Sequence, residues 1–219
     1  MPFQQSILIE SQYLPPIQYF SKLVQYATIF IEQQEHYAKG SYRNRCEIAT
    51  ANGILALSIP LQKGKNEQQP IRAVRIAYHE PWQRLHWESI RSAYGNAPFF
   101  EFYEDALKPF FQTPYEFLFD FNWALLQLLL QLLGLRPNLG LTQRFEQPPP
   151  PEVLDFRDAL SPKAHRRQPD PHFQPRRYAQ VFEEKHGFLP NLSILDLLFC
   201  TGPEAISFLQ LTIKHPTVK

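Results

Sequence analysis

Apolar and polar positions near the start of the chain switch from strand-like to helix-like spacing and back. Ser6–Glu10 is a short apolar run typical of a strand, and Pro15–Pro16 stand where a helix can begin, because proline is tolerated in a first turn. Apolar residues then recur at helical spacing at Ile17, Phe20, Leu23, Val24 and Ala27. Thr28–Glu32 follows as a second strand. This order predicts a parallel βαβ unit with a right-handed crossover.

The next segment has the pattern of a β-hairpin. Cys46–Thr50 and Ile54–Leu61 are joined around Asn52-Gly53, a strong signal for a type I′ turn, which needs positive φ at both central residues. Gln62–Gln69 is expected to be a polar loop, and Ile71–Ala77 a further strand.

Helical spacing dominates the middle and the end of the chain. Pro81 begins a helix that runs to about Tyr94, Phe99–Phe111 is typical of a short helix and turn, and Pro114–Leu133 is a long helix. Three short helical patterns follow at Tyr178–Phe182, Ser193–Phe199 and Glu204–Leu211.

One apolar segment has the length of a membrane span. Phe117–Leu135 is mostly apolar, but Asp120, Gln127 and Gln131 fall on one stripe, as expected for an amphipathic helix that packs on a core. Gly134 then supplies an ordinary helix stop. We therefore expect a soluble core helix and no membrane insertion, with the membrane span as the alternative.

Residues 137–175 break these patterns with nine prolines, including Pro148–Pro151. Such a length is unusual for a plain connection. The segment is either a flexible tether or a proline-stiffened arm that returns over a site. We predict an α/β fold with a parallel βαβ start, an added β-hairpin and helices packed on the sheet. The expected parts are an α/β core over 1–136, a proline-rich connecting arm over 137–177 and a helical segment over 178–219 that packs on the core.

Composition narrows the functional classes. The 219 residues carry a net charge of only +1, whereas nucleic-acid binders usually show a basic excess, so we expect no nucleic-acid partner. The 8 glycines form neither GxGxxG nor GxxxxGK[ST], which argues against a glycine-rich phosphate loop. No secretory signal is visible at the N-terminus, and the two cysteines form no CxxC pair, so a cytoplasmic location is expected.

The densest polar cluster is His36–Arg45, directly after the second predicted strand, where open α/β sheets bind ligands. Lys39, Arg43 and Arg45 could hold an anionic group, and His36 could act as acid or base. The alternative is a solvated basic connection without a ligand.

Further candidates lie within apolar stretches. His86 shares the apolar stripe of its helix, and Asn122 points towards the core, so each is either a satisfied core residue or a ligand contact. Asp196 is likewise an acid in an apolar run, and Cys46 is expected to serve packing rather than nucleophilic chemistry. The His and Cys residues lack metal-ligand spacing, so no metal site is expected, and the cofactor is open.

Several of these residues form a longer pattern. His36-Tyr37-x-Lys39-x-x-Tyr42-x-Asn44-Arg45-x-x-Ile48 is similar to the Tyr-x-Lys-x-x-aromatic-x-Asn-Arg motif of the WbqC-like family. Further similarities to this family lie at Pro15–Phe20, Leu57–Pro60, Trp82-x-x-x-His86, Ala93–Tyr94, Ala97–Phe99, Asp120–Asn122, Asp155–Arg157, Pro162–Lys163, Tyr178-x-Gln180-x-Phe182 and Ser193–Leu198. The chain departs from the family pattern at Glu10-Ser11-Gln12 and Glu32-Gln33-Gln34, which replace Gln-Pro and Asp-Asp, and the C-terminal third lacks the usual glycine-rich stretch.

The resemblance implies a role in surface-polysaccharide (O-antigen) biosynthesis, with transfer of glycine or a similar acyl group to a sugar. In the first hypothesis the chain is a transferase that takes an activated sugar or acyl donor. His36 or His86 would act as acid or base, and the substrate would contact the residues Lys39, Tyr42, Arg43, Asn44, Arg45 and Asn122.

The second hypothesis is a non-catalytic binding or assembly protein of the same pathway. An enzyme should place Lys39, Asn44, Arg45 and His86 around one concave pocket, whereas a scaffold should pair and seal them. The sequence leaves the oligomeric state open.

Overall fold

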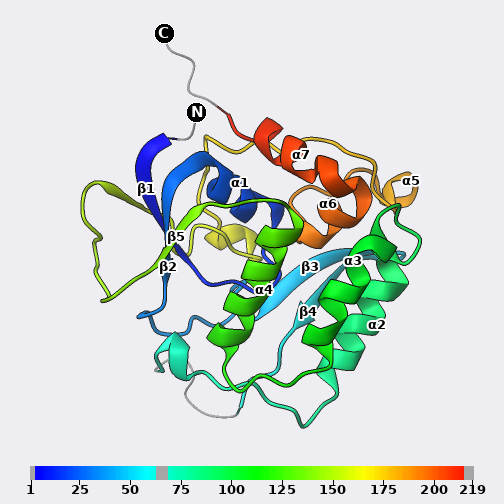
Figure 1. The fold of residues 1–219 in the computed structure, drawn as a ribbon, viewed down its shortest axis with the longest axis horizontal. Helices are drawn as coiled ribbons and strands as arrows, with labels where there is room; N and C mark the ends of the chain where they lie inside the picture. Colours follow the sequence, from blue (N-terminus) through cyan, green and yellow to red (C-terminus); the bar gives the residue numbers. More distant parts are fainter. Residues whose placement is uncertain (1–2, 63–68, 215–219) are drawn as a thin grey trace.

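The computed structural model describes residues 3–62 and 69–214, so most of the expected polar loop over 62–69 lies outside the described residues. A four-stranded parallel sheet organises the fold, with strand order β5-β2-β1-β6. The chain forms β1 (Phe3–Glu10), α1 (Ile17–Gln25) and β2 (Tyr26–Glu32), and β1 and β2 pair in parallel (Figure 1). The predicted α/β class and βαβ start are confirmed.

The outer strands of this sheet come from the proline-rich segment. β5 (Asn138–Leu141) pairs with β2, and β6 (Val153–Asp155) pairs with β1. The segment therefore completes the sheet, and the loop between β5 and β6 projects from its side (Figure 1). The division of the chain into three parts remains a prediction.

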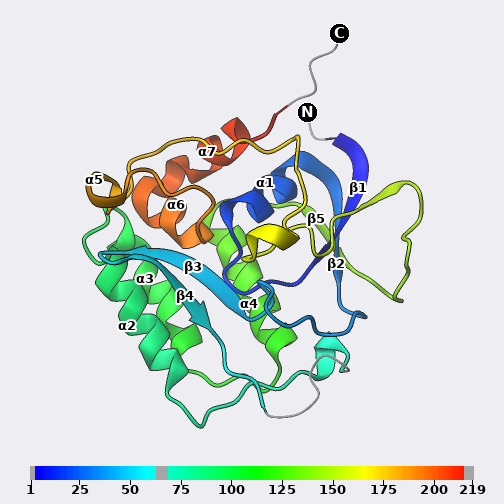
Figure 2. The same cartoon turned by 180° about the vertical axis from the view of Figure 1, so that it is seen from behind.

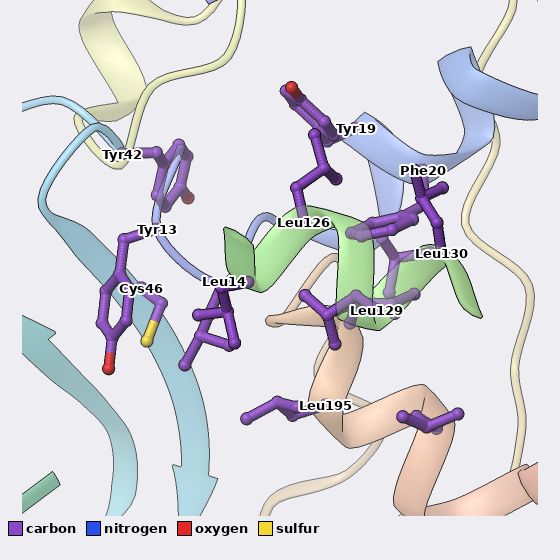
Figure 3. Close-up of a cluster of buried hydrophobic side chains, with 14 of the residues drawn as sticks. Tyr13, Leu14, Tyr19, Phe20, Tyr42, Cys46, Leu126, Leu129, Leu130 and Leu195 are labelled. Atoms are coloured by element: carbon purple, nitrogen blue, oxygen red, sulfur yellow. The ribbon is translucent and has the colours of Figure 1, made fainter. Parts of the chain in front are cut away.

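The sheet has one wholly apolar face. Side chains alternate along a strand, and Ile7, Ile9, Ile29 and Ile31 are completely buried. Figure 3 shows part of the core, where Phe20 of α1 and Leu129 of α4 (Leu118–Leu132) lie among other apolar side chains. The opposite face carries Ser6, Leu8, Phe30 and the acids discussed below, so the two faces of the sheet differ in chemistry.

The predicted hairpin consists of β3 (Arg45–Thr50) and β4 (Gly53–Ser58), paired antiparallel as a separate two-stranded sheet (Figure 2). The type I′ turn was wrong in detail. Thr50 pairs with Gly53, so the turn is centred on Ala51 and Asn52, and only Gly53 has a positive φ, of 102°. Asn52 therefore avoids the left-handed region.

The expected strand Ile71–Ala77 was wrong. Ile71–Ala73 is a 3₁₀ turn (η2), and only isolated bridges follow, from Arg75 to Phe117 and from Ile76 to Leu61. The buried residues Ile71, Val74 and Ile76 give this segment its apolar pattern, but it pairs with no continuous strand.

Helices complete the fold largely as expected. α2 (Trp82–Tyr94) follows Pro81, and α3 (Phe100–Leu107) leads into the 3₁₀ turn η3 (Lys108–Phe111). α4 begins at Leu118, four residues later than predicted. The C-terminal part contains η4 (Ala164–Arg166), α5 (Glu183–His186), α6 (Ile194–Thr201), η5 (Gly202–Glu204) and α7 (Ala205–Leu211). The helix expected over Tyr178–Phe182 was wrong, because helical structure starts at Glu183.

The apolar segment around α4 forms a helix of 15 residues, shorter than a typical span. Within the described ranges, one stretch, Ile194–Leu211, is long and apolar enough to cross a membrane by length and composition, and 61% of it is buried in the fold. It comprises α6, η5 and α7 and bends at Gly202, which has a φ of 55°. Burial among other elements is what a core helix shows.

Candidate functional site at the carboxyl ends of the sheet

Acidic residues end three neighbouring strands of the parallel sheet. Glu10 ends β1, Glu32 ends β2 and Asp155 ends β6, and Glu10 lies opposite Glu32 in the strand register. In open α/β sheets, ligands bind beyond these carboxyl ends. Glu10 and Glu32 are completely buried. Buried acids at this edge need compensating partners, and the structure supplies two arginines.

Arg157 is the first of these arginines. Its guanidinium donates to Glu32 Oε2 at 3.0 Å, to both carboxylate oxygens of Asp155 at 2.9 and 2.8 Å, and to the Glu146 carbonyl at 2.8 Å. The same group lies 4.9 Å from the ring centre of Phe145. Arg157 therefore joins two strand ends to the loop between β5 and β6.

Arg43 is the second, and it is one of the largest fully buried side chains. It forms a two-bond pair with Glu35, with Nε to Oε1 at 2.8 Å and Nη2 to Oε2 at 2.6 Å, and it also donates to Asp158 at 2.7 Å. Such a fork-to-fork pair fixes the side chain firmly. Arg43 is thus occupied by acids within the fold.

Glu10 lies beside this pair. One of its carboxylate oxygens accepts from Gln12 Nε2 at 2.6 Å, and the other accepts from the backbone N–H of Asp158 at 3.1 Å. The pKa of Glu10 is raised to about 7, and burial is the largest cause. Arg43 lowers this pKa, whereas Glu35 and Asp158 raise it further. Glu10 therefore exchanges a proton near neutral pH, which is the property that acid–base chemistry needs.

A pocket of about 420 Å³ opens on the same face of the sheet. Ser6, Leu8, Phe30 and Glu32 form its floor, and the loop between β5 and β6 forms its wall, with Thr142, Arg144, Glu146 and two prolines, Pro149 and Pro150. This volume is within the range of small-molecule sites. The pocket reaches the buried acids through Glu32, which accepts from Thr142 Oγ1 at 2.6 Å.

The cluster His36–Arg45 predicted from the sequence does not converge on this pocket. Asn44 accepts from Tyr37 and donates to the Ile59 carbonyl at 2.9 Å, and Arg45 donates to Ser58 at 3.1 Å. His36 and Lys39 are exposed. Tyr42 is buried, and its hydroxyl donates to Glu47 at 3.1 Å.

The two candidates on helices are buried and bonded within the fold. His86 Nδ1 lies 2.9 Å from the Tyr13 hydroxyl, and burial lowers the pKa of His86 to about 4, which keeps the ring neutral at physiological pH. Asn122 donates to the Arg43 carbonyl at 2.7 Å, so it holds the loop that carries Arg43. The Oδ1 atom of Asn122 is buried and has no hydrogen-bond partner among the described residues.

Cys46 and Asp196 also have internal roles. Cys46 is buried, and burial raises the pKa of its thiol, so the thiolate is disfavoured. Asp196 accepts from Tyr94 at 2.9 Å, from Tyr178 at 2.6 Å and from Gln180 at 2.8 Å. Among the residues that the structure describes, no three His, Cys, Asp or Glu side chains are grouped as metal ligands.

The sequence prediction missed Glu35, named Arg157 only within a family similarity and treated Glu10 and Glu32 only as departures from the family pattern. The available signal was an acid at the end of each apolar strand run, Ser6–Glu10 and Thr28–Glu32. A charged residue that ends a buried strand lies at the ligand-binding edge of a parallel sheet. This signal is local and could have been used.

Comparisons with known proteins agree with the family resemblance of the sequence. The sequence model of the WbqC-like protein family matches residues 10–157, more than half of the chain, and this range includes Glu10, Glu32, Arg43 and Arg157. An uncharacterized protein of Mycobacterium tuberculosis, Rv1507c, is 28% identical over 229 aligned positions, covering 93% of this chain and 96% of that protein. No solved structure matches the chain.

Proposed function

The chain belongs to the WbqC-like protein family, and we propose that it is a cytoplasmic group transferase of surface-polysaccharide biosynthesis. It would move an acyl, aminoacyl or related group from an activated small-molecule donor to a sugar. The observation that carries this proposal is the sheet edge, where the buried Glu10, with a pKa of about 7, lies in register with Glu32 beside a pocket of about 420 Å³.

The proposed chemistry is acyl transfer assisted by a general base. Glu10 would take the proton of the acceptor hydroxyl or amine through Glu32, its register neighbour, which lines the pocket. The freed lone pair forms a bond to the donor carbonyl carbon, and the donor's leaving group departs with its bonding electrons. A base with a pKa near the working pH suits this step, because it is substantially ionised and still holds the proton it receives.

Donor binding would use the cations that remain at the surface. Arg43 is taken up by Glu35. Lys39 and Arg45 of the predicted loop do not line the pocket, so they would meet only an anionic part of the donor that extends beyond it. His36 is exposed on the same loop and stays a candidate acid or base. His86 is the weaker candidate because it is buried against Tyr13.

A non-catalytic binding or assembly role is the second candidate. It is favoured by one observation: Arg43, Asn44 and His86 are bonded to other parts of the fold instead of lining the pocket. A scaffold would use these residues to brace the loop between β2 and β3. In that case the pocket at the sheet edge would bind without turnover.

The experiment is a thermal-shift screen against nucleotide sugars, acyl thioesters and amino acids, followed by mass spectrometry of acyl transfer. A ligand at about 100 times its Kd stabilises by about 2.7 kcal/mol, roughly 5–10 °C for this chain length. Ser6→Phe fills the pocket and should abolish the shift. Gln127→Phe adds the same ring on α4, outside this pocket, and should preserve it.

Measuring acyl transfer then distinguishes the transferase from the non-catalytic scaffold. Glu10→Gln should retain ligand binding and lose transfer if the chain is an enzyme. Binding without transfer by the wild type supports the scaffold role. A flat screen, or a shift that survives in Ser6→Phe, contradicts the assignment of the pocket.

A further inference from the structure

Among the described residues, the hairpin β3–β4 has one covered edge and one edge without a partner strand. On β3, the Glu47 carbonyl accepts from the Ser193 N–H at 2.8 Å, and the Ala49 N–H donates to the Tyr94 hydroxyl at 3.2 Å, so both residues direct their backbone groups outward. Residues opposite each other in an antiparallel pair direct these groups in the same sense, inward or outward. The partners of Glu47 and Ala49 are Ala56 and Ile54, whose outward groups lie along the free edge of β4.

His86 of α2 hydrogen-bonds the backbone of Ser58 at one end of this edge, and the rest of the edge lacks the features that normally protect one. β4 reads Gly-Ile-Leu-Ala-Leu-Ser, without a charge or a proline. Natural edge strands are usually blunted by lysine, proline, bulges or a covering element. Ile54 is 54% exposed and Leu55 is 38% exposed, so apolar side chains accompany the unpaired backbone. An undefended edge of this kind is a template on which another strand can pair.

A groove runs beside the edge. It has a volume of about 540 Å³ between the tip of β3–β4 and α2, and its lining includes Leu55, Leu85, Ser89 and Ser92 (the hairpin and α2 are seen in Figure 2). Leu85 is 46% exposed. Glu88 is the charged member of the lining, and it already pairs with Arg84 on α2. The groove therefore suits an uncharged, extended, apolar segment.

We propose that β4 of a second copy of this chain occupies this edge, forming a dimer through an antiparallel β4–β4 contact. β4 is itself uncharged, extended and apolar, so it meets the requirement that the edge and the groove set. A twofold axis places identical uncharged strands against each other, and no like charges meet along the contact. The two hairpins then form one four-stranded antiparallel sheet, β3-β4-β4-β3.

The test measures mass and amide protection on the full chain. Light scattering coupled to size exclusion should give twice the chain mass, and the amides of Ile54 and Ala56 should exchange on the order of tenfold or more slowly than in a monomeric variant. Ile54→Lys places a charge on the edge. Ala56→Pro removes an outward N–H that β3 does not use, which an edge strand tolerates. Both variants should be folded monomers by circular dichroism and scattering.

Phe102→Lys is the matched control, because Phe102 on α3 is 78% exposed and is neither in the hairpin nor among the residues that line the groove. This variant should remain dimeric. A wild type that is monomeric from micromolar to near-millimolar concentration, with fast exchange at Ile54 and Ala56, overturns the proposal. A dimer that persists in folded Ile54→Lys and Ala56→Pro also overturns it, because another surface would then form the contact.

Discussion

The ionisation of Glu10 is the most direct test of the electrostatics at the sheet edge. The pKa of this carboxyl is raised from 4.5 to about 7, first by burial and then by Glu35 and Asp158, against the opposing effect of Arg43. A raised pKa means that the native state keeps a proton that the unfolded chain has already released. Between pH 4.5 and about 7 the native state binds more protons, so the free energy of unfolding falls as the pH rises.

The magnitude follows from the two pKa values. The interval from 4.5 to about 7, at about 1.4 kcal/mol per pH unit, corresponds to about 3 kcal/mol. This destabilisation is absent below pH 4.5, grows through the interval and is complete above about pH 7. Glu10→Gln removes the titration and keeps an oxygen that can accept from Gln12 or from the Asp158 N–H.

The assay is urea unfolding of the wild type and Glu10→Gln at a series of pH values between 4.5 and about 8. We expect the variant to gain about 3 kcal/mol relative to the wild type across this range. Asp196, whose pKa burial also raises, lies in a separate network and titrates in both proteins, so its effect cancels in the difference. A difference in the free energy of unfolding that stays constant with pH would refute the reasoning.

Two further perturbations test the packing. Gly202→Ala should destabilise by about 1–3 kcal/mol in urea unfolding, because a Cβ there would lie 2.4 Å from the Phe99 ring at a φ of 55°. Gly134→Ala, at a φ of 67° with open space around it, isolates the backbone cost and should lose less. Arg157→Lys keeps the charge but loses the fork that holds Glu32 and the β5–β6 loop, so we expect a loss of about 1.5–3 kcal/mol and faster limited proteolysis of that loop. Unchanged proteolysis would show that Arg157 does not hold the loop.

The βαβ unit and the hairpin could be predicted because their signals are local. The apolar runs around Pro15–Pro16 change period within a few residues, and the hairpin has its turn residues between two apolar runs. The boundaries of α1 and α2 agree with the prolines that precede them, Pro16 and Pro81. Such elements can be predicted from the local sequence, without knowledge of the segments that pack against them.

β5 and β6 could not be predicted in the same way. They are 4 and 3 residues long, too short for an alternating pattern, and they lie among prolines. Each exists because β1 or β2 offers an unpaired edge, so the determining contacts come from more than a hundred residues away. Ile71–Ala77 failed for the opposite reason: it has an apolar pattern but no continuous partner strand.

The sequence placed a candidate site at the same edge of the sheet as the buried acids, but with other residues. The density of cations in His36–Arg45 suggested an anion site. A sequence does not show which acids of the same chain lie near these cations, so their internal ion pairs could not be foreseen. Arg43 meets Glu35 eight positions earlier and Asp158 more than a hundred positions later, and these pairs convert a predicted ligand contact into an internal ion pair. The prediction of His86 as a core residue or a ligand left both outcomes open, and its bond to Tyr13 favours the first.

The buried acids also explain why the proline-rich segment is part of the site. Burying a carboxylate costs several kcal/mol unless a cation and hydrogen bonds compensate it. Arg157, two residues after the end of β6, forms the ion pair with Glu32. Asp158, the next residue, forms an ion pair with Arg43. The pairing of β6 with β1 places this segment beside the buried acids. Asp158 donates its backbone N–H to Glu10 and its carboxylate raises the pKa of Glu10, so the proline-rich segment contributes directly to the proton affinity of that residue.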